Sequence, residues 1–279
     1  MPPATRAAAR HALPGLTPPL NRMQLATWNL NSLKVRLPHL LDWLAAQQPD
    51  VVCLQETKLD DPFFPAAAFQ TAGYHAIYSG QKTYNGVAIL SKAAAHETVT
   101  AIPGWVDPQK RVLAATIAGV RVICIYVPNG QSVDSDKYDY KLRWLAALHH
   151  WLQVELTHYP KLALLGDFNI APQARDVYDA AAWEGKILCS PPERAALQAL
   201  LDLALKDSFR LFPQEDASYS WWDYRMNAFR RNLGLRIDHI LLSAPLAESC
   251  IACRIDKAPR RLERPSDHAP VIAVLDLPD

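Results

Sequence analysis

Polar side chains stand at the ends of several apolar segments of the chain. Asn29 and Asn31 close the segment MQLATWNLN, Glu56 closes DVVCLQE, and Asp167 and Asn169 follow KLALLG. The two asparagines of the first segment are two positions apart, so in an extended chain their side chains share a face. In α/β sheets, ligand crevices form at the strand exits. We therefore expect these groups to converge on one site.

Further polar positions follow the same pattern later in the chain. Tyr126 ends an apolar segment and is followed by Asn129, Asp238 interrupts LRIDHILLS, and Asp267 and His268 precede the last apolar segment. Taken singly, each is explained as a turn residue, a helix cap or a surface group. Asp238 fits that explanation least, because a carboxylate among isoleucines needs a polar partner. The whole set indicates a site.

This inventory suits the hydrolysis of a phosphodiester. Mg²⁺ prefers one or two carboxylates, waters and substrate phosphate, and Glu56 with Asn29 could supply the protein ligands. The reaction also needs a group that orients and deprotonates water, donors to the phosphate oxygens, and a group that stabilises the leaving oxygen. The candidates for these parts are Asp167, Asn169, Tyr126 and His268. Asp238 could fix the tautomer of the imidazole and raise its basicity.

The segments that position these residues read as interleaved strands and helices. Strands are predicted at 23–31, 50–56, 85–92, 161–169, 217–225, 235–243 and 270–277, with a hairpin over 111–130. Leucines at helical spacing predict helices that end at Pro49 and Pro160, and a third helix follows the prolines at 191–192. This alternation predicts an α/β fold.

The composition is typical of a soluble globular protein with a large core. The chain has 279 residues, a formal net charge of +1, and half of its residues are hydrophobic. We expect one domain over 23–279, because no linker or repeat interrupts the pattern, and a disordered extension over 1–22. The near-neutral charge argues against wrapping of nucleic acid but leaves room for a local basic groove. No segment has the apolar length of a membrane span, so no membrane association is expected.

The cysteines indicate a reducing compartment. The chain has an odd number of them, and no second pair could complete a zinc site with Cys250 and Cys253. We therefore expect buried free thiols and a cytoplasmic location. The five are Cys53, Cys124, Cys189, Cys250 and Cys253.

Six ordered motifs resemble a known family. TWNLNSL, LQETK, YVPNG, LLGDFNIAP, GLRIDHIL and RPSDHAPV closely resemble the exonuclease III family of DNA-repair nucleases, within the endonuclease/exonuclease/phosphatase superfamily. The resemblance runs from about Met23 to the C-terminus. It implies a four-layered α/β sandwich, in which two mixed sheets pack face to face and helices flank them. It also implies Mg²⁺- or Mn²⁺-dependent hydrolysis of duplex DNA.

The resemblance assigns roles position by position. Glu56 would be the main metal ligand, helped by Asn29 and Asp267, with Asp167 and Asn169 also at the metal site. Asp167 would position or deprotonate the attacking water, and Asn169 and Tyr126 would bind the scissile phosphate. His268, oriented by Asp238, would contact that phosphate or act as the base.

The segment SYSWWDYRMNAFRRNLGLR distinguishes DNA from smaller substrates. Trp221 and Trp222 offer stacking surface, and the cations that follow could hold phosphates; in the family this loop enters the minor groove. An aromatic strand pair followed by a solvated basic loop is the alternative. The cations are Arg225, Arg230 and Arg231, and further DNA contacts are expected from Arg111, Lys82 and Asn129.

The expected function is repair of duplex DNA by a monomeric enzyme. The substrates would be 3′ ends, 3′-blocking groups and abasic sites, through 3′–5′ exonuclease, 3′-end-cleaning and abasic-site endonuclease activity. The alternatives are an enzyme that cuts mainly abasic sites, a phosphatase of small phosphoesters, and an inactive DNA-binding relative.

Leu188 departs from the family pattern. Counted back from Glu193, it takes a position where relatives that cut abasic sites usually carry Gly or Ser. Its side chain could fill the space that an extruded abasic sugar needs, which predicts stronger activity at 3′ ends. Alternatively, Leu188 packs inward and has no effect on the substrate.

Overall fold

A computed structural model describes residues 21–277 of the chain. The first strand, β1 (Asn21–Asn29), begins two residues before the expected Met23. Except for those two residues, the expected extension over 1–22 lies outside the described residues.

The first of two large sheets is mixed and has six strands. β1 pairs in parallel with β2 (Val51–Gln55) and antiparallel with β14 (Val271–Leu277). β13 (Cys250–Ile255) flanks β14, and β4 (Val87–Ser91) and β3 (His75–Ser79) complete the sheet beyond β2. The strand after residue 269 therefore lies beside the strand that begins the described chain.

The second sheet is also mixed and has six strands. β7 (Val120–Tyr126) and β8 (Leu162–Asp167) pair in parallel at its centre. β6 (Val112–Ile117) and β5 (Ala95–Val99) extend one side, and β12 (Asp238–Leu242) and β9 (Lys206–Asp207) extend the other. β12 aligns Asp238 with Asp167 across the ladder.

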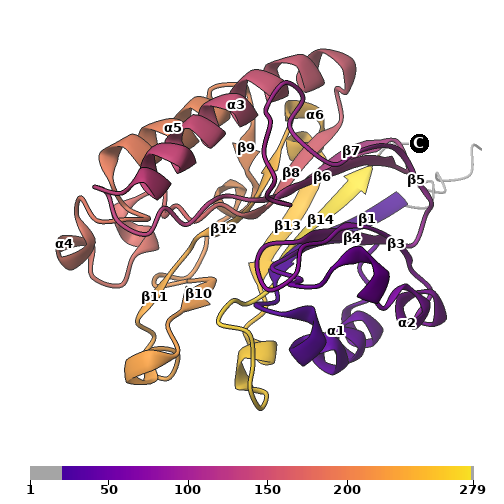
Figure 1. The fold of residues 1–279 in the computed structure, drawn as a ribbon, viewed down its shortest axis with the longest axis horizontal. Coiled ribbons are helices and arrows are strands. Elements are labelled where there is room, and N and C mark those ends of the chain that lie inside the picture. The colour runs from indigo at the N-terminus through magenta and orange to yellow at the C-terminus, as the bar shows by residue number, and fades with distance from the viewer. Residues whose placement is uncertain (1–20, 278–279) are drawn as a thin grey trace, which may run out of the picture.

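The sheets pack face to face, with helices on both outer surfaces (Figure 1). Apolar side chains of both sheets, among them Leu25, Cys53, Cys124 and Leu165, form the central core. Trp28 and Leu54 on the outer face of the first sheet pack with helices α1 (Leu33–Gln47) and α2 (Ala66–Thr71). The second sheet packs in the same way against α3 (Asp136–His158) and α5 (Pro191–Leu201). The predicted four-layered sandwich is confirmed.

Short elements connect these layers. They are α4 (Ala180–Trp183), α6 (Ala244–Glu248), the two-residue strands β10 (Trp221–Trp222) and β11 (Gly234–Leu235), and 3₁₀ turns at 61–63, 174–176, 208–211, 225–227 and 258–261. None of the helices within residues 21–277 is long and apolar enough to cross a membrane.

Several strands differ from the sequence-based prediction. Of the segment 217–225, only the two tryptophans form a strand, and 3₁₀ structure begins again at Arg225. β3 and β5 were not predicted, because these edge strands lack a run of buried apolar residues: most residues of β3 are half-buried and most of β5 are exposed. β13 was missed too, and it contains both Cys250 and Cys253. All five cysteines are buried and free, as predicted.

Candidate active site

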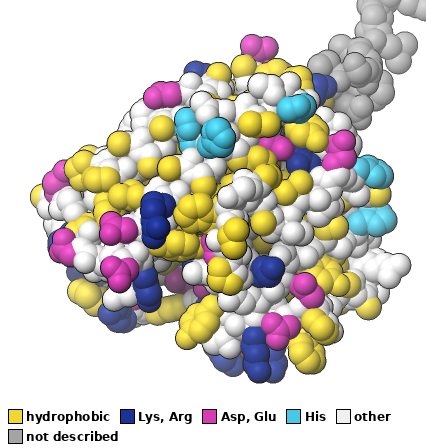
Figure 2. Space-filling model, turned by 45° about the horizontal axis from the view of Figure 1, so that its top comes forward, with side chains coloured by type: hydrophobic (Ala, Val, Ile, Leu, Met, Phe, Trp, Pro, Cys, Tyr) yellow, Lys and Arg dark blue, Asp and Glu magenta, His cyan; other side chains and the backbone are white. Residues whose placement is uncertain are grey.

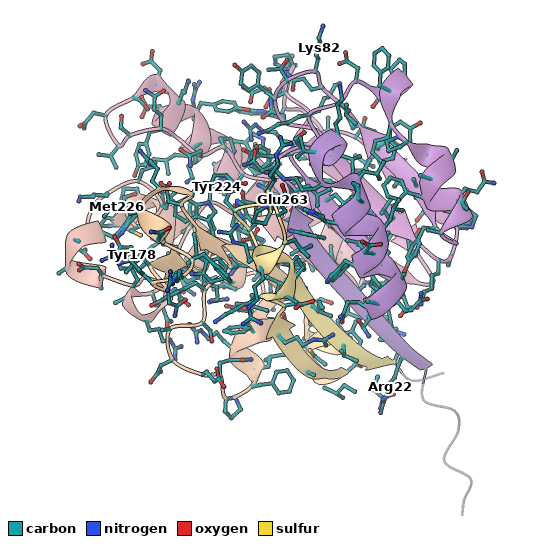
Figure 3. The ribbon with its side chains drawn as sticks, turned by 90° about the horizontal axis from the view of Figure 1, so that it is seen from below. Arg22, Lys82, Tyr178, Tyr224, Met226 and Glu263 are labelled. Atoms are coloured by element: carbon teal, nitrogen blue, oxygen red, sulfur yellow. The ribbon has the colours of Figure 1, made fainter. Side chains whose placement is uncertain are left out.

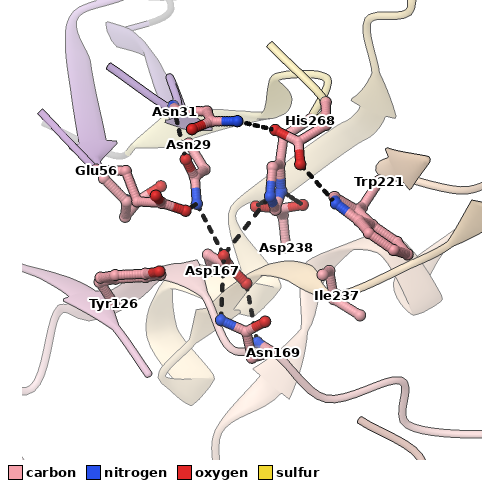
Figure 4. A network of polar contacts seen from close by, with 12 residues as sticks. Asn29, Asn31, Glu56, Tyr126, Asp167, Asn169, Trp221, Ile237, Asp238 and His268 are labelled. Carbon is pink, nitrogen blue, oxygen red and sulfur yellow. Dashed lines mark hydrogen bonds and ion pairs between the residues drawn. The ribbon is translucent and has the colours of Figure 1, made fainter. Parts of the chain in front are cut away.

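The predicted polar residues meet where the ends of the two sheets adjoin (Figure 4). The first sheet contributes Asn29 from the end of β1 and Glu56 directly after β2. The second contributes Asp167 from β8 and Asp238 from β12. His268 comes from the turn before β14. The parallel pairs β1–β2 and β7–β8 place these strand ends at one edge, which is why the exits converge.

Asn29 links the two sheets through its side chain. Its buried amide nitrogen donates to Glu56 Oε1 and to Asp167 Oδ2, each at 2.9 Å. Its amide oxygen accepts a hydrogen bond from the backbone N–H of Asn31 at 2.9 Å. The oxygen that was expected to hold a metal is therefore bound to the main chain, and Asn29 acts as a bridge between carboxylates.

Lys58 is a site residue that the sequence reasoning missed. Its ammonium lies 2.8 Å from Glu56 Oε2 and donates to Asn31 Oδ1 at 2.6 Å. Both Glu56 and Lys58 have left-handed backbone, with φ of 52° and 54°. This tight turn folds the lysine back onto the glutamate, and its spacing two residues after Glu56 in LQETK was the available signal.

His268 lies between two carboxylates. Its Nδ1 is 2.9 Å from Asp238 Oδ2, and its Nε2 is 3.7 Å from Asp167 Oδ2. Ser220 donates to Asp238 at 2.7 Å and completes the chain of contacts. Burial acts to lower the pKa of His268, but the charges of Asp238 and then Asp167 outweigh it, so the pKa is raised above its usual value. The predicted pairing of Asp238 with the imidazole is present.

Asp167 is enclosed almost completely by the protein. It is buried and accepts hydrogen bonds from the Asn29 side chain and from the backbone N–H of Asn169 at 2.9 Å. Burial raises the pKa of Asp167, and the charge of His268 partly opposes this effect. A carboxylate with a raised pKa is better suited to accept a proton near neutral pH.

Tyr126 lies to one side of Asp167 in Figure 4, and Asn169 lies below it. Asn169 donates its amide to Val127 O at 3.0 Å and accepts from Asn129 at 3.1 Å. Burial, followed by the charges of Glu56 and Asp167, raises the pKa of Tyr126 well above its usual value, so the phenol keeps its proton. The phenol of Tyr126 can act as a neutral donor to an anion, whereas the Asn169 amide already donates to Val127 O and, at 3.3 Å, to Asp167 Oδ2.

A cleft of about 620 Å³ opens beside Tyr126. Arg111 stacks its guanidinium on the Tyr126 ring at 4.6 Å and donates to the Tyr126 carbonyl at 3.1 Å. It is nearly buried, so it fixes the tyrosine in addition to lining the cleft. Asn129, Tyr84 and Lys137 also line this cleft.

The two tryptophans of β10 point in different directions. Trp221 donates its indole N–H to Asp267 at 3.0 Å, and Asp267 also accepts from Asn31 at 3.0 Å. Trp222 is completely buried and donates to Asn232. The prediction that Trp222 stacks on DNA is therefore wrong, because neighbouring residues of a strand face opposite sides.

The predicted DNA-contact cations lie on separate flanks of the site. Figure 3 shows Lys82 apart from Tyr224 and Met226, the two residues that flank Arg225 in the sequence. Lys82, Arg225, Arg230 and Arg231 are exposed. Arg225 forms an ion pair with Asp223 at 2.6 Å. On the face drawn in Figure 2, basic and acidic side chains are interspersed, as the net charge of +1 suggests.

Leu188 is buried behind the wall of the site. It packs in an apolar cluster with Ile237 and Leu235, against which Trp221 also packs. Its backbone is left-handed, with φ of 71°, and its N–H donates to Glu193 at 3.0 Å. It packs inward, as the alternative explanation held, but next to residues that line the site (Figure 4).

Glu56, Asp167 and His268 could hold a metal ion. Their ligand atoms all lie within 4.8 Å of one another. Two carboxylates close together, with access to solvent at Glu56, fit the oxygen ligands that Mg²⁺ and Mn²⁺ prefer.

Comparison with known proteins decides the family. Residues 26–268 match the model of the endonuclease/exonuclease/phosphatase family. The chain belongs to this family. It is 38% identical over 265 residues to exodeoxyribonuclease III of Haemophilus influenzae, which covers 90% of this chain and 99% of the relative. The predicted family and the predicted class, a phosphodiester-hydrolysing nuclease, are confirmed.

Solved structures agree with this assignment. The 3′ phosphatase NExo from Neisseria, bound to a product DNA hairpin, is 52% identical with a TM-score of 0.90, over 91% of this chain and 99% of that chain. An AP endonuclease from Archaeoglobus fulgidus is 38% identical with a TM-score of 0.88, over 91% of this chain and 100% of that chain.

Proposed function

We propose that this family member is a metal-dependent DNA-repair phosphodiesterase that acts on the 3′ ends of duplex DNA. The observation that carries the proposal is the enclosed Asp167, held by Asn29 and Asn169 and facing His268. In this arrangement Asp167 can accept a proton from water, and His268 beside it can donate a hydrogen bond to a phosphate. The site is complete within one chain, which supports action as a monomer.

Mg²⁺ or Mn²⁺ would be held by Glu56 together with Asp167. When bound, the ion would neutralise charge on the phosphate oxygens. Asp267 accepts a hydrogen bond from the side chain of Asn31, and its carboxylate would add negative charge near the ion. Asn29 keeps Glu56 and Asp167 in place.

The protein groups would divide the remaining work. Asp167 orients water and accepts its proton. Asp238 keeps the imidazole of His268 protonated. The imidazolium then donates a hydrogen bond to the phosphate, whose negative charge favours the protonated form. Tyr126 donates to a remaining phosphate oxygen, and Asn169 would do so by exchanging its 3.3 Å hydrogen bond to Asp167 for one to the phosphate.

The conformation of Leu188 supports a preference for 3′ ends. A left-handed backbone costs a residue with a side chain about 1–2 kcal/mol, a cost that glycine avoids. Leu188 has an isobutyl side chain despite this cost, and the side chain packs against Ile237. Because Leu188 is buried behind Ile237, it would limit how far that wall of the site can yield to an extruded sugar, whereas a free 3′ end approaches without threading that space. The Neisseria 3′ phosphatase supports the same preference, while the Archaeoglobus AP endonuclease supports abasic-site cutting as the second candidate.

One assay separates these candidates. Labelled duplexes with a recessed 3′ end, a 3′-phosphate or an internal abasic site are incubated with Mg²⁺ or with EDTA, using the wild type and Asp167→Asn. We expect processing of both 3′ ends, slower abasic incision, and no reaction in EDTA or with the variant. Activity in EDTA, or equal abasic incision, contradicts the proposal.

A further inference from the structure

A buried ion pair lies directly behind the site and takes no part in the chemistry described so far. Lys141 of α3 and Glu193 of α5 approach to 2.5 Å, and neither side chain is exposed to solvent. Taking both charges out of water costs several kcal/mol for each ion, which their attraction repays only when the remaining hydrogen bonds are made.

Lys141 uses its ammonium to hold two loops of the site. Besides Glu193, it donates to Asn169 O at 2.7 Å and to Asn129 O at 3.2 Å. The side chains of these two asparagines are themselves hydrogen-bonded at 3.1 Å. The lysine therefore fixes the main chain of Asn129, which lines the cleft, and of Asn169, which contacts Asp167.

Glu193 holds a third loop. Its carboxylate accepts from the backbone N–H of Leu188 at 3.0 Å and from the N–H and hydroxyl of Ser190 at 3.1 and 2.7 Å. These bonds fix the turn in which Leu188 adopts its left-handed conformation.

The loop around Gly130 packs closely on the same pair. A side chain at Gly130 would come within 3.1 Å of Lys141 and 2.8 Å of Ile187. Three loops are thus hydrogen-bonded to one charged pair, and the loop at Gly130 also packs closely against it.

From these contacts we infer that Lys141 and Glu193 are positioning residues that hold Asn129, Asn169 and Leu188 in the geometry needed for turnover. Two helices can be joined as stably by apolar side chains, but apolar side chains cannot bind three loops through their backbone groups. The inference rests on the proposed function, since it assigns the pair a part in that reaction.

The test uses the double variant Lys141→Met/Glu193→Leu, which leaves no unpaired buried charge. The matched control is Arg121→Met/Glu155→Leu, because that buried pair at 2.7 Å also involves α3 but lies away from the site. Each protein is melted, its DNA affinity is measured in Ca²⁺, and kcat and KM are measured on a duplex with a 3′-phosphate.

We expect the Lys141/Glu193 variant to lose about tenfold to a hundredfold in kcat, since small misplacements of site groups have effects of this size. KM and DNA affinity should stay within about threefold, and the control should keep its kcat. A folded Lys141/Glu193 variant with wild-type kcat overturns the inference, as does an equal loss in the control. An inactive wild type would instead overturn the proposed function.

If the double variant does not fold, Glu193→Gln decides. It keeps the shape and one acceptor oxygen but loses the second acceptor oxygen, which serves Ser190, and the negative charge that pairs with Lys141. A reduced kcat with unchanged KM supports the inference, and wild-type kcat in this folded variant overturns it.

Discussion

The amide nitrogen of Asn29 holds two carboxylates of the site in place. One amide nitrogen lies 2.9 Å from an oxygen of Glu56 and 2.9 Å from an oxygen of Asp167. The shared donor keeps two like charges near each other, which would otherwise repel. The charge of Glu56 is thereby available to a cation on its more exposed side.

Replacing Glu56 with Gln should change the metal dependence of cleavage. The variant keeps the shape of the side chain but removes its charge, so cleavage at limiting Mg²⁺ should collapse and partly recover at high Mg²⁺. A Mg²⁺ titration of cleavage measures this, with the surface variant Glu184→Gln as control. If Glu56→Gln titrates like the wild type, Glu56 is not a metal ligand.

Replacing Lys58 with Met should tighten metal binding to the DNA-free protein. The ammonium occupies oxygens of Glu56 and Asn31 that a cation would otherwise approach. Its removal should strengthen Mn²⁺ binding about fivefold to tenfold, since a partly exposed ion pair contributes on the order of 1 kcal/mol. Electron paramagnetic resonance of free Mn²⁺ measures this directly. Weaker binding in Lys58→Met would show that the lysine supports the metal site.

At the scale of elements, the loop between β10 and β11 should bind DNA through fewer cations than the sequence suggests. Arg225 is already paired with Asp223, which leaves Arg230 and Arg231 free of that competition. Replacing all three with Ala should reduce the log–log salt slope of duplex binding by about two units, at roughly 0.9 per phosphate contact. Arg254→Ala on β13 is the control. An unchanged slope would indicate a solvated loop without DNA contacts.

The sequence predicts the central elements well and the peripheral ones poorly. Strands such as KLALLGDFN are buried on both sides, so an apolar run followed by polar residues marks them. β3 is mostly half-buried and β5 mostly exposed, and neither carries such a run. Trp222 was misplaced because a pair of residues does not reveal which one of them faces the core.

Within the site, residue types were predictable and atomic roles were not. The sequence indicates that Asn29 and Glu56 lie together, because both end central strands. It does not indicate which amide atom faces the carboxylate, since a hydrogen bond from Asn31 decides that. Lys58 was missed because a left-handed turn, not strand geometry, brings it to the site.

At the scale of the whole molecule, a buried charge network joins the second sheet to its surrounding loops. Arg236 binds Asp176 at 2.7 Å and Asp207 at 2.8 Å. Its guanidinium also lies 3.0 Å from His239 Nδ1, while His239 Nε2 lies 2.9 Å from Ile170 O. Burial, followed by the charge of Arg236, lowers the pKa of His239, so the imidazole stays neutral in the folded protein.

This network predicts a loss of stability in mild acid. In the unfolded chain His239 takes up a proton as the pH falls below about 6.5, whereas the folded state with its lowered pKa does not. The contribution of His239 to the free energy of unfolding should therefore fall below that pH, by up to about 1.4 kcal/mol per pH unit, while the raised pKa of Asp167 acts in the opposite direction. Urea unfolding at pH 7.5, 6.5 and 5.5 measures this. His239→Gln should show a shallower dependence, and an equal slope would rule out His239 as the source.

The position of β14 in the first sheet has a consequence for protein synthesis. β14 lies between β13 and β1, and His268 and Asp267 directly precede it. On the ribosome, β1 emerges among the first segments and waits for a partner made more than two hundred residues later. A nascent chain therefore carries Glu56 and Asp167 long before it can assemble them with the imidazole. A fragment that ends before residue 268 would lack the imidazole that we place beside Asp167, so we expect it to hydrolyse no DNA even if it binds it.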